Sequence, residues 1–201
     1  FASYHFDDMV LVRRKEYELD CNWKLYVENA MEDYHTPTVH RKSIGRQITV
    51  PEETHGQWDA IHMEAADTIA VLPGDTTPFP HIPTLTGKAA TGTFFALIYP
   101  AVFFATTKDC MWFLQTIPLG PAKSRVSVGS CFPRSTVQRP DFEEIVQRYY
   151  KRWDKSLPED NAISELQQAG LRASLARPGR LSLREPVVHS LANWVLDRVL
   201  G

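Results

Sequence analysis

The sequence predicts an α+β domain in which an antiparallel sheet is wrapped around long helices. Between residues 93 and 132, β-branched and aromatic residues gather in short runs that are separated by turn residues. After residue 140, apolar residues recur at helical spacing instead. Runs of strands followed by helices indicate an α+β domain. The connections between the strand runs are too short for the crossovers that parallel strands need, so the sheet is expected to be antiparallel.

The N-terminal part is expected to supply a strand and then a helix. A strand is predicted over residues 9–15 and a helix over residues 24–35. A proline lacks a backbone donor and pushes the preceding residue out of helical space, so this helix is expected to break just before Pro37. A short turn would then carry His40 back toward His35.

The sheet is predicted from alternation over residues 57–71 and from four runs rich in β-branched and aromatic residues. These runs cover residues 94–98, 102–107, 112–117 and 125–132. Aromatic residues on alternating strand positions belong to the core more often than to a ligand site. Phe95, Phe104, Trp112 and Phe132 could line a pocket, but we interpret them as core residues and assign none of them as a substrate contact. Residues 74–92 form a long loop, which is either a mobile cover over a cavity or a surface excursion without a role.

Three helices are predicted in the C-terminal part. The first follows Pro140-Asp141 and covers residues 142–153. The second contains Asp160 and reaches about residue 174, with Ser156 and Glu159 forming a capping box at its start. The third begins near residue 185.

Composition indicates one domain with a small-molecule partner. The chain has 201 residues, of which 43% are hydrophobic, which is enough for a sizeable core. A formal net charge of -2 gives no electrostatic footprint for nucleic acid or an anionic membrane. No apolar run approaches membrane-spanning length. Three widely separated cysteines make a disulfide framework improbable and favour a cytoplasmic setting.

Two histidines five positions apart, His35 and His40, follow the carboxylates of Glu28, Glu32 and Asp33. Two neutral imidazoles and one carboxylate on one face of Fe(II) leave open positions for dioxygen and a substrate. Glu32 precedes His35 by three residues, so its carboxylate is expected to orient that imidazole. The other five histidines have no comparable context and are assigned no function; they are His5, His55, His62, His81 and His189.

At these residues the chain resembles the C-terminal catalytic domain of Rieske non-heme iron oxygenases, the alpha subunits of ring-hydroxylating oxygenases. The matching motif comprises Asn22-Trp23-Lys24, Glu28-Asn29, Glu32, His35 and His40. Most members carry an aspartate where this chain has Glu32; glutamate there resembles the branch that oxidises small quaternary ammonium compounds. By the same resemblance, Asp160 is the third metal ligand. Without the motif, Asp160 would be interpreted as an acid that complements a helix dipole.

The resemblance implies a helix-grip fold of the Bet v1/START type with a substrate cavity. It also implies catalytic roles for Glu32, which would bridge to the redox centre of a neighbouring subunit, and for Asn29, which would hydrogen-bond near the iron. The implied partners are dioxygen, a small-molecule substrate, a reductase, and the Rieske domain of a neighbouring subunit in a homotrimer.

A Rieske [2Fe-2S] cluster is not expected on this chain. Such a cluster needs two cysteines and two histidines, and Cys21, Cys110 and Cys131 have no histidine at the required short spacing. Residues 1–201 are therefore expected to form a single catalytic domain, with the N-terminal Rieske domain absent from this chain. Alone, this domain should bind iron but accept electrons poorly.

The predicted function is hydroxylation of a small organic substrate, which is either an aromatic ring or a small amine. The enzyme would be a monooxygenase or a dioxygenase. If the substrate is aromatic, the role would be aromatic catabolism. Two alternatives remain open. The fold could serve as a binding module for an apolar ligand, without a catalytic metal. Two histidines and an acid also suit zinc, as in a hydrolase, although the HExxH spacing is missing.

Overall fold

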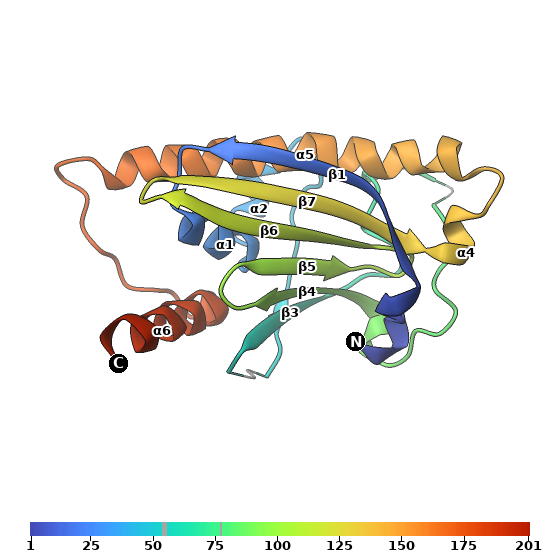
Figure 1. The fold of residues 1–201 in the computed structure, drawn as a ribbon, viewed down its shortest axis with the longest axis horizontal. Helices are drawn as coiled ribbons and strands as arrows, with labels where there is room; N and C mark the ends of the chain where they lie inside the picture. The colour runs from blue at the N-terminus through green and yellow to red at the C-terminus, as the bar shows by residue number, and fades with distance from the viewer. Residues whose placement is uncertain (54–55, 77) are drawn as a thin grey trace.

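A seven-stranded antiparallel sheet organises the domain (Figure 1). The computed structural model describes residues 1–53, 56–76 and 78–201, so Thr54, His55 and Thr77 lie outside it. The strands are β1 (Met9–Leu19), β2 (Val50–Pro51), β3 (Trp58–Glu64), β4 (Gly92–Ile98), β5 (Val102–Thr106), β6 (Met111–Gly120) and β7 (Lys123–Pro133). Their order across the sheet is β1-β7-β6-β5-β4-β3-β2. The predicted α+β class is confirmed.

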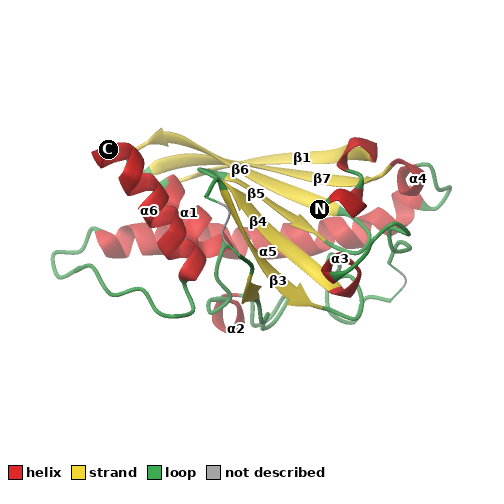
Figure 2. Cartoon of the chain, turned by 90° about the horizontal axis from the view of Figure 1, so that it is seen from below, coloured by secondary structure: helices red, strands yellow, loops and turns green. Residues whose placement is uncertain are grey.

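The helices gather mainly on one side of this sheet (Figure 2). They are α1 (Trp23–Ala30), α2 (Thr36–Val39), α3 (Lys88–Thr91), α4 (Arg134–Val137), α5 (Phe142–Leu171) and α6 (Pro186–Leu200), with short 3-10 turns at Ala2–Tyr4 and Phe6–Asp8. The long helix α5 runs along one face of the sheet, and α1 packs between α5 and β6. Among the described residues, no helix has the length and apolarity that a membrane crossing requires.

Pairing between β1 and β7 extends the first strand beyond the predicted limit at residue 15. β1 pairs antiparallel with β7, and the register continues to Leu19 opposite Ser124. The partner strand therefore provides hydrogen bonds to a segment whose own sequence, Glu16 to Glu18, is polar. β3 is shorter than the predicted 57–71 alternation and ends at Glu64.

An aromatic layer joins α5 to the sheet. Residues on one face of α5 recur at helical spacing and are buried, namely Phe142, Val146, Tyr149, Trp153 and Leu157. The rings of Trp112 and Trp153 lie 5.7 Å apart, and those of Phe132 and Tyr149 lie 5.1 Å apart. Burying each such side chain contributes about 1.5–3 kcal/mol. The interpretation of Trp112 and Phe132 as core residues agrees with their burial.

The predicted helix break between residues 153 and 160 is wrong. α5 is one helix of 30 residues with Pro158 inside it. A proline in a helix removes one backbone hydrogen bond, but here buried residues on both sides, such as Trp153 and Asn161, hold the helix against the rest of the domain. Because the helix does not start there, Ser156 and Glu159 do not form a capping box.

The loop at residues 74–92 is anchored in the core near its middle. Phe79 is buried, stacks on Phe142 and Tyr149, and donates its backbone N–H to the Tyr149 hydroxyl at 2.8 Å. Ile82 is also buried, in a small cluster with Tyr4. None of the described residues of this loop lines the cavity beside the histidines.

Candidate metal centre

The two histidines flank a four-residue helix rather than ending a long one. α1 ends at Ala30, and α2 begins directly after His35 and ends directly before His40. The predicted break before Pro37 is therefore misplaced: the chain leaves helical structure after Ala30, and Pro37 lies in the first turn of a new helix. Proline is favoured there because the first backbone N–H groups of a helix have no intrahelical partner.

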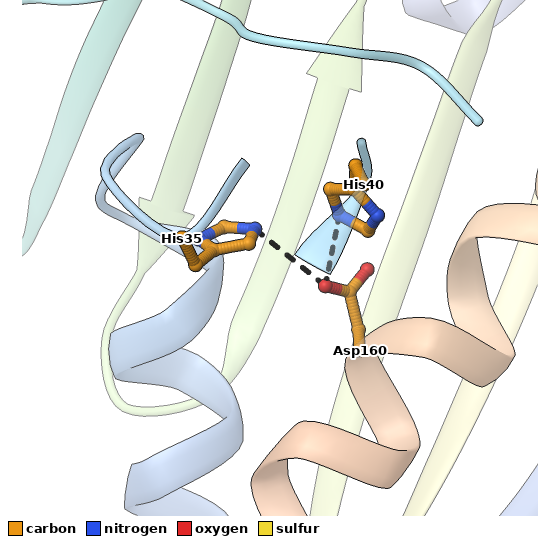
Figure 3. Close-up of side chains that lie close together, drawn as sticks. All are labelled: His35, His40 and Asp160. Atoms are coloured by element: carbon orange, nitrogen blue, oxygen red, sulfur yellow. Dashed lines mark ion pairs between the residues drawn. The ribbon is translucent and has the colours of Figure 1, made fainter. Parts of the chain in front are cut away.

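This short helix directs both imidazoles toward Asp160 of α5 (Figure 3). The Oδ1 atom of Asp160 lies 3.6 Å from His35 Nε2 and 3.1 Å from His40 Nε2. One ligand atom from each of the three residues lies within 4.8 Å of the others. Ligands about 2.1 Å from one ion at near-octahedral angles lie about 3 Å apart. The three side chains can therefore chelate one metal ion together.

Each imidazole is oriented by a carboxylate on its far side. Glu32 Oε1 lies 2.5 Å from His35 Nδ1, and Glu159 Oε2 lies 2.7 Å from His40 Nδ1. A carboxylate at Nδ1 keeps the proton on that nitrogen and leaves the Nε2 lone pair for a metal. Glu159 also accepts a hydrogen bond from Ser43 at 2.5 Å. The three side chains that would bind the metal, and the two carboxylates that orient the imidazoles, thus both fit a divalent cation.

The electrostatic environment of His40 favours a positive charge at this point. Burial by itself lowers the pKa of His40, but hydrogen bonds and negative charges from Asp160 and Glu159 more than reverse this, so the pKa of His40 lies above its usual value. A proton and a metal cation are attracted by the same negative electrostatic potential. The acidic surroundings therefore suit a bound cation as well.

Asn29 and Asp33 have different positions relative to the group. Asn29, on α1, donates from Nδ2 to Asp160 Oδ1 at 3.1 Å and so fixes the carboxylate that faces both histidines. Asp33 points elsewhere: it accepts from the backbone of Thr49 at 2.8 Å and pairs with Arg184 at 2.5 Å. Asn29 therefore belongs to the site, whereas Asp33 stabilises contacts between other parts of the domain.

A cavity of about 80 Å³ adjoins the three side chains. Its remaining lining is largely apolar and includes Tyr26, Ile61, Phe95, Phe103, Trp112 and Leu114. One charged side chain away from the histidines also lines it, Arg152 of α5. Phe104 instead contacts Phe1 and Phe6 at ring distances of 5.4 Å and 5.8 Å.

The sequence reasoning identified the three grouped residues, Glu32 and Asn29, but missed Glu159 and the cavity residues. Glu159 was assigned to a helix cap, although the second histidine needs an orienting acid as much as the first. That requirement was a usable signal. Phe95 and Trp112, for which the sequence favours a core role over a pocket role, are buried and line the cavity as well. No local sequence pattern distinguishes those two roles.

The fold and this group define a class of protein, one in which three side chains that could hold a metal ion lie beside a cavity in a helix-gripped sheet. A family model described as "Ring hydroxylating alpha subunit (catalytic domain)" matches residues 6–201. The chain belongs to this family, and the resemblance to Rieske oxygenases is confirmed.

Curated relatives of the chain are hydroxylating enzymes. The chloroplastic choline monooxygenase of Arabidopsis thaliana is 25% identical over 179 residues, which cover 88% of this chain and 39% of that protein. The putrescine 2-hydroxylase of Ralstonia nicotianae is 26% identical over 185 residues, covering 88% of this chain and 48% of that protein. The chain therefore spans less than half the length of these relatives.

Solved structures show the same fold. A quaternary ammonium Rieske monooxygenase associated with carnitine oxidation by gut microbiota matches with a TM-score of 0.67 at 20% identity, over 96% of this chain and 51% of that one. Naphthalene 1,2-dioxygenase from Rhodococcus sp. matches with a TM-score of 0.65 at 14% identity, over 96% of this chain and 57% of that one. The predicted helix-grip architecture agrees with these neighbours.

Proposed function

We propose that this chain is the catalytic domain of a Rieske-type oxygenase that hydroxylates a small organic substrate at a mononuclear Fe(II) centre. The metal ligands in this proposal are His35, His40 and Asp160. The observation that carries it is the convergence of these three side chains at 3.1 Å and 3.6 Å, with an orienting carboxylate behind each imidazole. Bound Fe(II) would supply the redox chemistry by which dioxygen reacts with a C–H or C=C bond.

The protein residues have separate tasks in this proposal. Glu32 and Glu159 hold the imidazole tautomers that leave Nε2 free, and Asn29 holds the Asp160 carboxylate by a hydrogen bond at 3.1 Å. The largely apolar cavity wall holds the substrate beside the metal site. Catalytic roles for Glu32 and Asn29 remain predictions.

Glu32 is suited to connect the site with a redox partner. It lines both the inner cavity and a second, outer hollow of about 490 Å³ that also includes Glu28, Tyr34 and Glu185. Its carboxylate contacts His35 Nδ1, and the residue borders this outer hollow. In the proposal, the Rieske [2Fe-2S] domain of a neighbouring subunit in a homotrimer docks there, and a reductase supplies that cluster. Cys21, Cys110 and Cys131 are buried and form no disulfide with one another, and the proposal places the cluster on another domain.

Metal analysis tests the proposal. The chain is loaded anaerobically with Fe(II), freed of excess metal and assayed for iron, with His35→Ala compared against His189→Ala. His189 is exposed on α6, so its replacement controls for the loss of any histidine. We expect stoichiometric iron in the wild type and in His189→Ala, and little in His35→Ala.

Equal iron in the wild type and His35→Ala would refute the metal assignment. Zinc retained in preference to iron, with hydrolysis of model esters, would favour the hydrolase alternative. A co-purified hydrophobe in a protein that takes up no iron would favour the binding module.

A further inference from the structure

A buried arginine lies in the wall of the cavity and forms no ion pair with any residue that the structure describes. Arg152 is 5% exposed, lies on α5 and lines the cavity beside the candidate metal ligands. Its Nε donates to the Ile69 carbonyl at 2.9 Å and its Nη1 to the Ser156 hydroxyl at 3.5 Å. A guanidinium has five N–H donors. Among the described residues, no carboxylate lies within ion-pair distance of this side chain.

Burying the positive charge of Arg152 costs desolvation free energy, and an anionic ligand can offset that cost. Burial lowers the pKa of Arg152 from its usual value to about 10, and the charge of Asp160 only partly offsets this. The guanidinium is still charged at neutral pH. A buried charge is costly unless it is paired and hydrogen-bonded. A carboxylate matches the planar fork of a guanidinium with two parallel hydrogen bonds.

The aromatic wall beside Arg152 disfavours a ligand cation. The guanidinium carbon lies 4.8 Å from the centre of the Trp112 ring, on its face. A quaternary ammonium group binds to proteins through such ring faces. Here the face already holds a positive charge, so a second cation at this point would meet like-charge repulsion.

We propose that Arg152 binds the carboxylate of the substrate, so that the cavity takes a small organic acid rather than a purely cationic amine. This inference rests on the proposed function and narrows its substrate class. Arg152, Ser156 and Asp160 follow one another at intervals of four residues on α5, so the first and last are separated by about 12 Å along the helix. The substrate is therefore held by its carboxylate at one end of the cavity and presents a remote carbon to the metal site.

Isothermal titration calorimetry with an isosteric pair tests this assignment. Butyrate, butyramide and choline are titrated into the anaerobic, Fe(II)-loaded chain and into two variants, Arg152→Gln and Lys151→Gln. Lys151 is the adjacent, exposed residue of α5 and controls for the loss of one positive charge. We expect butyrate to bind at least about tenfold more tightly than butyramide in the wild type and in Lys151→Gln. In Arg152→Gln the ratio should fall to about one.

Direct binding of the carboxylate to iron is the competing explanation. The titrations are therefore repeated with His35→Ala, in which the metal site is disabled but Arg152 is intact. A butyrate preference that persists in His35→Ala supports the arginine, whether or not iron is the native metal. A preference that disappears in His35→Ala and survives in Arg152→Gln overturns the inference.

Other outcomes also decide the question. Equal binding of butyrate and butyramide to the wild type, or tighter binding of choline than of butyrate, refutes the assignment. If Arg152→Gln does not fold, Arg152→Lys replaces it: a point charge lacks the bidentate fork, so the butyrate preference should fall severalfold while remaining above one. An unchanged ratio in Arg152→Lys counts against a bidentate carboxylate site.

Discussion

Replacing Glu159 with alanine should weaken metal binding while leaving α5 intact. The Glu159 carboxylate accepts from His40 Nδ1 at 2.7 Å and from the Ser43 hydroxyl at 2.5 Å, so the substitution removes the carboxylate that orients this imidazole, together with the serine contact that holds that carboxylate in place. Loss of an outer-shell carboxylate typically costs about 10- to 100-fold in metal affinity. Alanine is the best helix former, so the helix itself should not suffer. We expect the Fe(II) dissociation constant to rise by about 10- to 100-fold, or about 1.4–2.7 kcal/mol.

The assay is an anaerobic Fe(II) titration against a chromogenic chelator, with urea unfolding of the metal-free protein measured in parallel. Glu144→Ala serves as the control, because Glu144 is an exposed acid of the same helix. A dissociation constant within twofold of the wild-type value would refute the assigned role of Glu159. Helix loss with unchanged metal affinity would instead show that Glu159 stabilises α5 and not the orientation of His40.

Two further predictions concern stability. Gly129 lies opposite Phe113 in the β6–β7 pair, and a Cβ built on it would lie 2.1 Å from the Phe113 ring. Gly129→Ala should therefore destabilise the fold by about 1–3 kcal/mol in urea unfolding. A variant as stable as the wild type would contradict this close packing. Burial raises the pKa of Asp109 despite hydrogen bonds from Thr68 and Tyr149, so the folded state holds this proton more tightly than the unfolded state. The free energy of unfolding should therefore fall as pH rises above about 4 toward the folded-state pKa of Asp109. It should fall less steeply in Asp109→Asn. The same pH dependence in both proteins would refute the raised pKa of Asp109.

The candidate site was predictable where its residues are close in sequence. Glu32, His35 and His40 lie within nine residues, so their spacing is visible without any fold. Asp160 required the family resemblance, because a lone acid in the first turn of a predicted helix is more simply explained by the helix dipole.

Helix boundaries failed at the prolines, for a physical reason. Pro37 was expected to end a helix but begins one, and Pro158 was expected to follow a break but lies inside α5. Local rules state what a proline costs the backbone. They do not state how much packing on either side of it contributes, and that packing holds α5 straight through Pro158 against the sheet.

The sequence by itself predicted the α+β class, the family motif and two candidate metal-binding histidines, because these depend on periodicity and on residue types at short spacing. Only the tertiary structure decided that Glu159 contacts His40 and that Arg152 faces the cavity with no carboxylate of the described residues in ion-pair contact. Both residues lie on α5, more than 100 positions from the histidine segment. Charge pairing depends on distances of a few ångströms, and those distances are set by how α5 packs across the sheet.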